Sequence, residues 1–281
     1  MIKSKKYSLL IHFAIMLFGI AGLYAKILDL PSIVIVWGRV IFAAAVLYFF
    51  TQKSNRLNLN KSFYLKLFLV GLILVIHWIT FFESIKVSTV GIGLISFSTF
   101  PLFVIFYSVV FEKTKLKLSD SASVLLILAG VYLIIPDYNF QNNVFLGVLY
   151  GLFSAISFAV LTVLNKKLVK DFDSSLLAYY QYLSASVILT PILFFIDFNF
   201  QISDLLHLIM LGAVLTALGH SLFIKSLEVI SAKKVSIITC LEPVYGIIFA
   251  LFLLGEIPDL RVIAGGSIII LTVIFITIKE N

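Results

Sequence analysis

Residues 239–249 read TCLEPVYGIIF and place a carboxylate, Glu242, beside a proline, Pro243, inside an apolar run from Val235 to Leu254. A charge at the centre of a membrane-length segment costs roughly 2.5 to 3.5 kcal/mol on insertion scales. Two explanations are open. Glu242 either accepts a proton or a substrate cation, or it bonds the backbone groups that Pro243 leaves without partners.

The composition indicates an integral membrane protein. Hydrophobic residues make up 61% of the chain and charged residues only 12%, whereas ordinary globular chains are about 25% charged. The single cysteine, Cys240, excludes an internal disulfide, and no metal-ligand spacing surrounds it. The sequence therefore predicts no metal site and no cofactor.

Ten apolar stretches approach the length of about 20 residues that a membrane-spanning helix needs. Short connections separate them, so most of the chain is expected within the lipid bilayer. The fifth stretch is short and Ser-rich, which leaves a re-entrant segment open there. The stretches are approximately 7–25, 31–51, 63–85, 88–111, 120–136, 144–165, 174–196, 205–226, 234–254 and 259–278.

The basic residues predict the orientation in the membrane. With the N-terminus in the cytoplasm, most of the 21 lysines and arginines fall on that side. Lys26, Lys86 and Arg261 lie outside and Arg39 lies within a helix. Both termini are then cytoplasmic, and the net charge of +7 reflects topology. Because the charges are dispersed over separate helix ends, no nucleic-acid partner is expected.

The two halves of the chain repeat one another. At the constant offset that carries Trp78 onto His220, the segment HWITFFESIKV echoes GHSLFIKSLEV, and Pro101 superposes on Pro243. Five helices per half is an odd number, so the second half must enter the membrane upside down. This is the inverted-repeat plan of secondary transporters, with a substrate site near the midplane.

The chain resembles the EamA-type members of the drug/metabolite transporter superfamily. The resemblance rests on LEPVYGIIFALFLLGEIPDLRVIAGGSIII (241–270), with weaker copies at FPLFVIFYSVVFEK (100–113) and LAGVYLI (128–134). It implies two five-helix EamA-type repeats, residues 1–140 and 141–281. Helices 1 to 4 and 6 to 9 would surround a central cavity, with 5 and 10 outside. Phe111 precedes Glu112 where the family pattern has glycine.

Four ionisable residues are candidates for substrate binding because buried ionisable groups in membranes usually face a cavity or each other. Arg39 is predicted about 12 Å from the outer end of its helix at 1.5 Å per residue, and His77 lies at a similar level. Glu242 and His220 are predicted nearer the inner side. A guanidinium matches a carboxylate in two bonds, so Arg39 is expected to bind an anionic group; the alternative is a structural anchor.

The seventh stretch carries a hydroxyl face. Hydroxyl-bearing side chains recur there at helical spacing and would share one side of the helix: Ser175, Tyr179, Tyr182, Ser186 and Thr190. We predict that this face lines the cavity and that Tyr179 and Tyr182 bind substrate; the alternative is hydrogen bonding between helices. Trp78, next to His77, is expected to stack on substrate. Pro101 and Pro243 are expected to act as helix bends.

Enzyme motifs are missing from the sequence: it has no HExxH pair, phosphate loop or Gly-x-Ser-x-Gly elbow. We therefore predict an all-α integral membrane protein of ten transmembrane helices, arranged as two inverted five-helix repeats. Its predicted function is secondary transport of a small organic metabolite such as an amino acid across the inner membrane, with export favoured by the resemblance. An intramembrane enzyme, a scaffold or a channel are the alternatives. Proton coupling and formation of a homodimer are left open.

Overall fold

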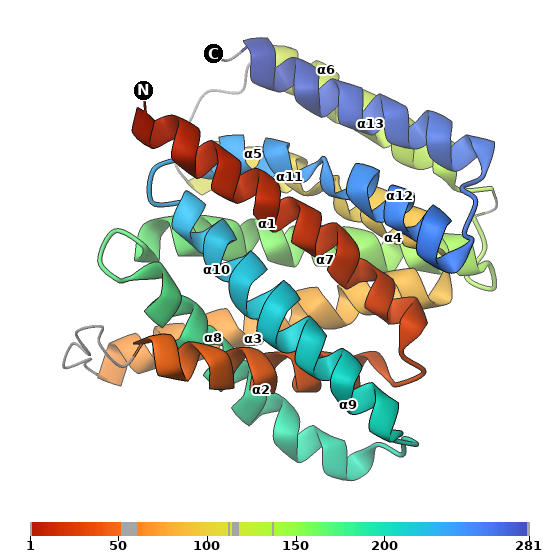
Figure 1. Cartoon of the computed structure of the whole chain (residues 1–281). Helices are drawn as coiled ribbons and strands as arrows, with labels where there is room; N and C mark the ends of the chain where they lie inside the picture. The colour runs from red at the N-terminus through yellow and green to blue at the C-terminus, as the bar shows by residue number, and fades with distance from the viewer. Residues whose placement is uncertain (1, 52–60, 112, 114–117, 137, 280–281) are drawn as a thin grey trace.

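The computed structural model describes residues 2–51, 61–111, 113, 118–136 and 138–279 (Figure 1). Within these residues every regular element is a helix. Eight helical segments are long and apolar enough to cross a membrane, and two shorter apolar helices cover Ala122–Ile134 and Leu260–Thr272. The protein is therefore a multi-pass membrane protein.

The helices of the first half follow the predicted stretches, except that the fourth stretch divides in two. They are α1 (Ile2–Ile27), α2 (Ser32–Thr51), α3 (Lys61–Val87), α4 (Val90–Phe97), α5 (Phe100–Phe111) and α6 (Leu118–Ile134). The second half is more broken. It comprises α7 (Asn143–Leu168), α8 (Ser174–Leu189), the 3₁₀ segment η1 (Thr190–Phe195), α9 (Ile202–Ile209), the π-helix η2 (Met210–Thr216), α10 (Ala217–Ser226), α11 (Ala232–Thr239), α12 (Glu242–Leu254) and α13 (Leu260–Lys279).

Two spans are broken at equivalent points. The span Val90–Phe111 breaks between α4 and α5, and the span Ala232–Leu254 breaks between α11 and α12. The breaks meet in space, because Sγ of Cys240 contacts the carbonyl oxygen of Ser98 at 3.3 Å across 142 residues of sequence. At this same spacing the N-cap side chains of both spans correspond: Thr89 accepts from the N–H of Ile92, and Ser231 from that of Lys234.

Pro101 and Pro243 each lie at the second residue of the helix that follows a break. Proline is well tolerated in a first helical turn, because the N–H it lacks has no intrahelical partner at that position. The prolines therefore begin new helices and do not interrupt continuous ones. Pro243 leaves no helical hydrogen bond for Glu242 to replace, so the structure does not support the packing explanation of Glu242.

The helices α2 and α8 lie side by side and run in opposite directions. Near the start of α2, Trp37 Nε1 donates to Thr190 Oγ1, just after the end of α8, at 3.1 Å. Near the end of α2, the ring of Tyr48 lies 6.2 Å from that of Tyr179, near the start of α8. Helices α2 and α8 correspond to the second of the five apolar stretches that the sequence predicts for each half.

The helices α6 and α13 form a pair at one edge of the molecule (Figure 1). Their backbones approach closely at Gly130 and Gly265: a Cβ atom on Gly130 would lie 2.8 Å from the carbonyl oxygen of Gly265, and one on Gly265 would lie 2.6 Å from that of Gly130. Neither helix contributes a residue to the central cavity described below. The remaining helices form the body of the protein.

Candidate functional site

A small buried cavity of about 30 Å³ lies in the body of the protein. Its walls are mainly aromatic, and the two ionisable groups of opposite sign among them come from α2 and α12. The residues that line it are Phe18, Ala21, Arg39, His77, Trp78, Phe81, Phe97, Phe158, His220 and Glu242. Arg39 and Glu242 therefore face one cavity, whereas the sequence placed them at separate outer and inner levels.

Arg39 is held in this cavity by a hydrogen bond and by stacking. The side chain is 3% exposed, and its Nε donates to Thr216 Oγ1 at 2.9 Å. The guanidinium carbon lies 3.9 Å from the centre of the Trp78 ring and 5.3 Å from that of Phe82. A guanidinium has five donors, so most of its hydrogen-bonding capacity is not used by Thr216.

Thr216 is the last residue of the π-helix η2. Its hydroxyl donates to the carbonyl oxygen of Leu211, five residues earlier, at 2.7 Å. The same hydroxyl oxygen then accepts from Arg39. Short π-helical segments are rare in proteins, and those that do occur are often found at functional sites. Here the hydroxyl of Thr216 contacts the cavity residue Arg39, and its carbonyl group lies within hydrogen-bonding distance of Tyr182, beside the cavity residue His220.

Tyr182 connects His220 to Thr216. The Tyr182 hydroxyl lies 3.2 Å from the carbonyl oxygen of Thr216 and 2.9 Å from His220 Nδ1. The hydroxyl has a single proton, so His220 Nδ1 donates to Tyr182 if that proton goes to the Thr216 carbonyl, and accepts from Tyr182 if it does not. Among the described residues, Nε2 has no hydrogen-bond partner.

Glu242 is the first residue of α12 and is 2% exposed. The partial positive charge of a helix N-terminus stabilises a carboxylate at this position. Within the described part of the chain, its Oε2 atom has no hydrogen-bond partner. The cavity therefore presents two polar atoms without a hydrogen-bond partner among the described residues, Glu242 Oε2 and His220 Nε2, together with the Arg39 cation.

His77 occupies another part of the cavity wall and is anchored to α7. Its Nδ1 lies 2.8 Å from Ser154 Oγ and 3.2 Å from the Ser154 carbonyl oxygen. The ring lies 4.5 Å from that of Phe158 and 5.4 Å from that of Phe97. Trp78, the next residue, stacks at 5.9 Å on Tyr182 and lies 5.5 Å edge-on to His220.

The hydroxyl face of α8 divides in the structure. Tyr182 is fully buried and bonded to the cavity residue His220. Tyr179 lies elsewhere, with its ring against Tyr48 and Tyr180. Ser186 donates to the carbonyl oxygen of Tyr182 in its own helix. The structure thus brings Arg39, His77, Trp78, Tyr182, His220 and Glu242 together, and it leaves Tyr179 apart from them.

Sequence reasoning missed several residues of the site. Thr216 was detectable, because it is a hydroxyl residue in an apolar run and lies one turn before His220 on the same helical face. Phe18, Phe97 and Phe158 were not detectable among 27 phenylalanines. Ser154 also lacked a signal, since serine is common in transmembrane helices as a hydrogen-bonding group.

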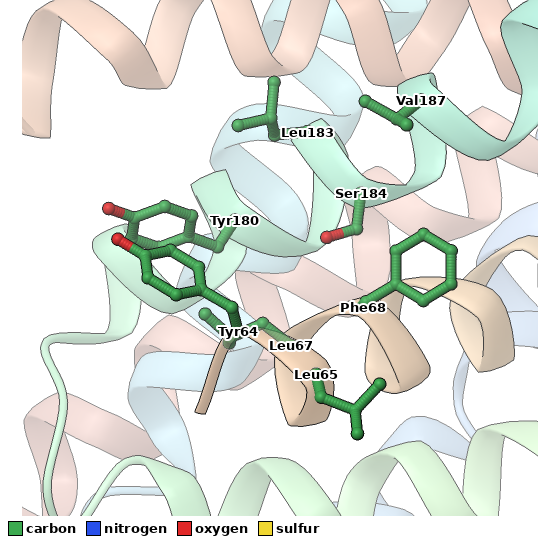
Figure 2. Close-up of a pocket in the computed structure, with 8 residues that line it drawn as sticks. All are labelled: Tyr64, Leu65, Leu67, Phe68, Tyr180, Leu183, Ser184 and Val187. Carbon is green, nitrogen blue, oxygen red and sulfur yellow. The ribbon is translucent and has the colours of Figure 1, made fainter. Parts of the chain in front are cut away.

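A larger hollow, of about 690 Å³, opens on the surface between α3 and α8 (Figure 2). Figure 2 shows Tyr64 and Tyr180 next to each other at one side of it, with Ser184 and with leucine, valine and phenylalanine side chains over the rest. None of the central cavity's ionisable residues lines this hollow. In the part of the chain that the structure describes, no three His, Cys, Asp or Glu residues gather to hold a metal ion.

Membrane-length helices enclose a small cavity lined by buried ionisable residues, and such residues in membranes often mark substrate or ion pathways, as in transporters. The chain belongs to the EamA-like transporter family, whose model matches residues 5–135 and 145–278. This confirms the family resemblance that the sequence indicated. It also confirms the prediction of a transporter in place of an enzyme.

Relatives support this assignment. "Uncharacterized transporter YxxF" of Bacillus subtilis (strain 168) is 24% identical over 88% of this chain and 81% of its own length. The "S-adenosylmethionine uptake transporter" of Rickettsia bellii (strain RML369-C) is 25% identical over 90% of this chain and 86% of its own length. A solved structure titled "Crystal structure of protein", 14% identical, has a TM-score of 0.73 and covers 98% of this chain and 96% of that chain, which shows the fold alone.

Proposed function

We propose that the protein is a secondary-active carrier that moves a small organic metabolite, such as an amino acid, by alternating access. In this proposal ten spans form two inverted five-helix repeats, residues 1–140 and 141–281. The equivalent breaks that meet at Ser98 and Cys240 support the repeat, as do the opposite directions of α2 and α8. The two halves would rock about the midplane, where such carriers bind substrate.

The observation that carries the proposal is the buried Arg39 guanidinium, which makes one side-chain hydrogen bond among the described residues and shares its cavity with two polar atoms that have no partner there. A planar guanidinium suits a substrate carboxylate. A Glu242 carboxylate suits an ammonium group or a proton, and His220 Nε2 offers a further hydrogen-bonding position. A zwitterion such as an amino acid would satisfy both sets of groups, with Trp78, His77 and Tyr182 completing the site.

The size of the cavity implies that the described state is closed. About 30 Å³ is close to the share of one water molecule in the liquid, while small-molecule pockets are typically about 300 to 1,000 Å³. A metabolite can therefore bind only after the helices separate. The breaks that precede Pro101 and Pro243 are the proposed hinges, since a few residues between helices can absorb such a change.

The proposed location is the inner membrane, with both termini cytoplasmic, as the distribution of basic residues favours. Export is proposed on the family resemblance alone. A relative named for uptake of S-adenosylmethionine makes uptake the second candidate. Coupling to protons through Glu242, and assembly as a homodimer, belong to this proposal as features to be measured.

The test is substrate binding and counterflow by the purified protein in liposomes, first with a mixture of the protein amino acids. Wild type is compared with Arg39→Lys and Arg39→Gln, and each substrate with an analogue whose carboxylate is amidated. We expect the Arg39→Lys variant to bind the acid more weakly than wild type does, and the Arg39→Gln variant to bind it more weakly still. Equal binding of acid and amide, or normal binding by both variants, would show that Arg39 is a structural anchor.

A further inference from the structure

A second polar cluster lies between α7 and α8, outside the central cavity. Gln181 of α8 donates from Nε2 to Asn165 Oδ1 of α7 at 2.7 Å. Thr162 lies one turn before Asn165 on the same face of α7. All three side chains are 0% exposed. Gly71 of α3 packs against the backbone of α8 at this level, since a Cβ atom there would lie 3.1 Å from the Gln181 carbonyl oxygen.

Each member of this cluster has an orphaned atom. Among the described residues, Thr162 Oγ1, Asn165 Nδ2 and Gln181 Oε1 have no hydrogen-bond partner. Reversing both amide groups does not help, because one amide donor and one amide acceptor are always left over. A buried polar group without a partner costs about 1 to 3 kcal/mol, and lipid supplies no hydrogen bonds. Apolar residues would fill this space without that cost.

The cluster extends, along one face of α7, a line of residues that begins beside the cavity. Ser154 bonds His77 and Phe158 lines the cavity. Thr162 and Asn165 follow at helical spacing on the same face. Asn165 is about 10 Å beyond Phe158 at 1.5 Å per residue, towards the basic end of α7 at Lys166 and Lys167. The line therefore leads from the cavity to the side predicted to be cytoplasmic.

The cluster also occupies a repeat-equivalent position. The spacing of 142 residues that relates Ser98 to Cys240 carries Arg39 onto Gln181, Leu23 onto Asn165 and Ile20 onto Thr162. The first half thus has one charge and two apolar residues where the second half has three uncharged polar residues. The two sides of the protein offer different chemistry to a passing polar group.

We propose that Thr162, Asn165 and Gln181 form an inner subsite that binds the polar end of the substrate, without a counter-charge, when the carrier opens to the cytoplasmic side. This inference rests on the proposed function and specifies its inner step. The orphaned donor, acceptor and hydroxyl fit a carboxyl, amide or hydroxyl group. Neutral hydrogen bonds are weaker than charge-assisted ones, so a substrate that has left Arg39 is held loosely there and released.

Access to this subsite can be measured by thiol labelling. The native thiol is removed with Cys240→Ser, and Asn165→Cys is then exposed to a membrane-impermeant maleimide from the cytoplasmic side of membrane vesicles. We expect labelling, and slower labelling in the presence of the protein amino acids. The matched control is Val163→Cys, which is also buried but lies on another face of α7 and should stay unlabelled. An unlabelled Asn165→Cys, or labelling that amino acids do not slow, would overturn the inference.

A second measurement uses Gln181→Met, which replaces the amide by an apolar side chain of similar size. We expect unchanged or higher thermal stability, substrate affinity within about twofold of wild type, and turnover about tenfold lower; Leu177→Met, one turn away in α8, should match wild type. Wild-type turnover in Gln181→Met would refute the subsite alone. Failure of the proposed function looks different, because wild type would then bind no amino acid at all.

Discussion

Replacing Thr216 by valine tests whether the π-helix positions Arg39. Valine has nearly the same shape but lacks the hydroxyl that accepts from Arg39 Nε at 2.9 Å. A hydrogen bond to a charged group contributes about 1.5 to 3 kcal/mol. Since each 1.4 kcal/mol is a factor of ten in affinity, substrate binding should weaken by about 10- to 100-fold if the whole contribution serves to orient the guanidinium.

The matched control is Thr216→Ser, which keeps the hydroxyl and removes only a methyl group. We expect Thr216→Ser to bind substrate within about fivefold of wild type, because one buried methyl group contributes only about 1 kcal/mol. Binding is measured by calorimetry on purified protein, with thermal unfolding recorded for all variants. If Thr216→Val and Thr216→Ser bind equally well, the hydroxyl does not position Arg39 and the role given to the π-helix is wrong.

Three further predictions concern the rest of the molecule. Glu242→Gln keeps the shape of the side chain but cannot titrate, so we expect a folded protein whose transport depends less on pH; a wild-type pH profile would exclude Glu242 as a proton acceptor. A reporter active only in the periplasm, fused after Asn281, should be inactive, and activity there would contradict the predicted topology. Gly19→Ala should lower stability by about 1 to 3 kcal/mol, because its Cβ would lie 2.9 Å from the backbone nitrogen of Gly246; an unchanged unfolding temperature would show that α1 and α12 can separate without cost.

The class of protein and the rough positions of its helices could be read from the sequence. Membrane-length apolar stretches have few alternatives, since lipid cannot satisfy exposed backbone groups and only helices or closed barrels can span it. The same reasoning selected Arg39, His77, His220 and Glu242, because ionisable residues in such stretches are rare and costly. Their chemical type was sufficient to indicate them without any knowledge of packing.

Tertiary structure alone decided how these residues meet. Hydropathy does not register a helix break, so the sequence stretch 234–254 concealed the one at Cys240 that makes Glu242 the first residue of a new helix. Depth counted along straight helices then separated Glu242 from Arg39, although both line one cavity. Helical periodicity likewise grouped Tyr179 with Tyr182. Periodicity shows which residues share one face of a helix, whereas the neighbouring helices determine which part of that face reaches the cavity.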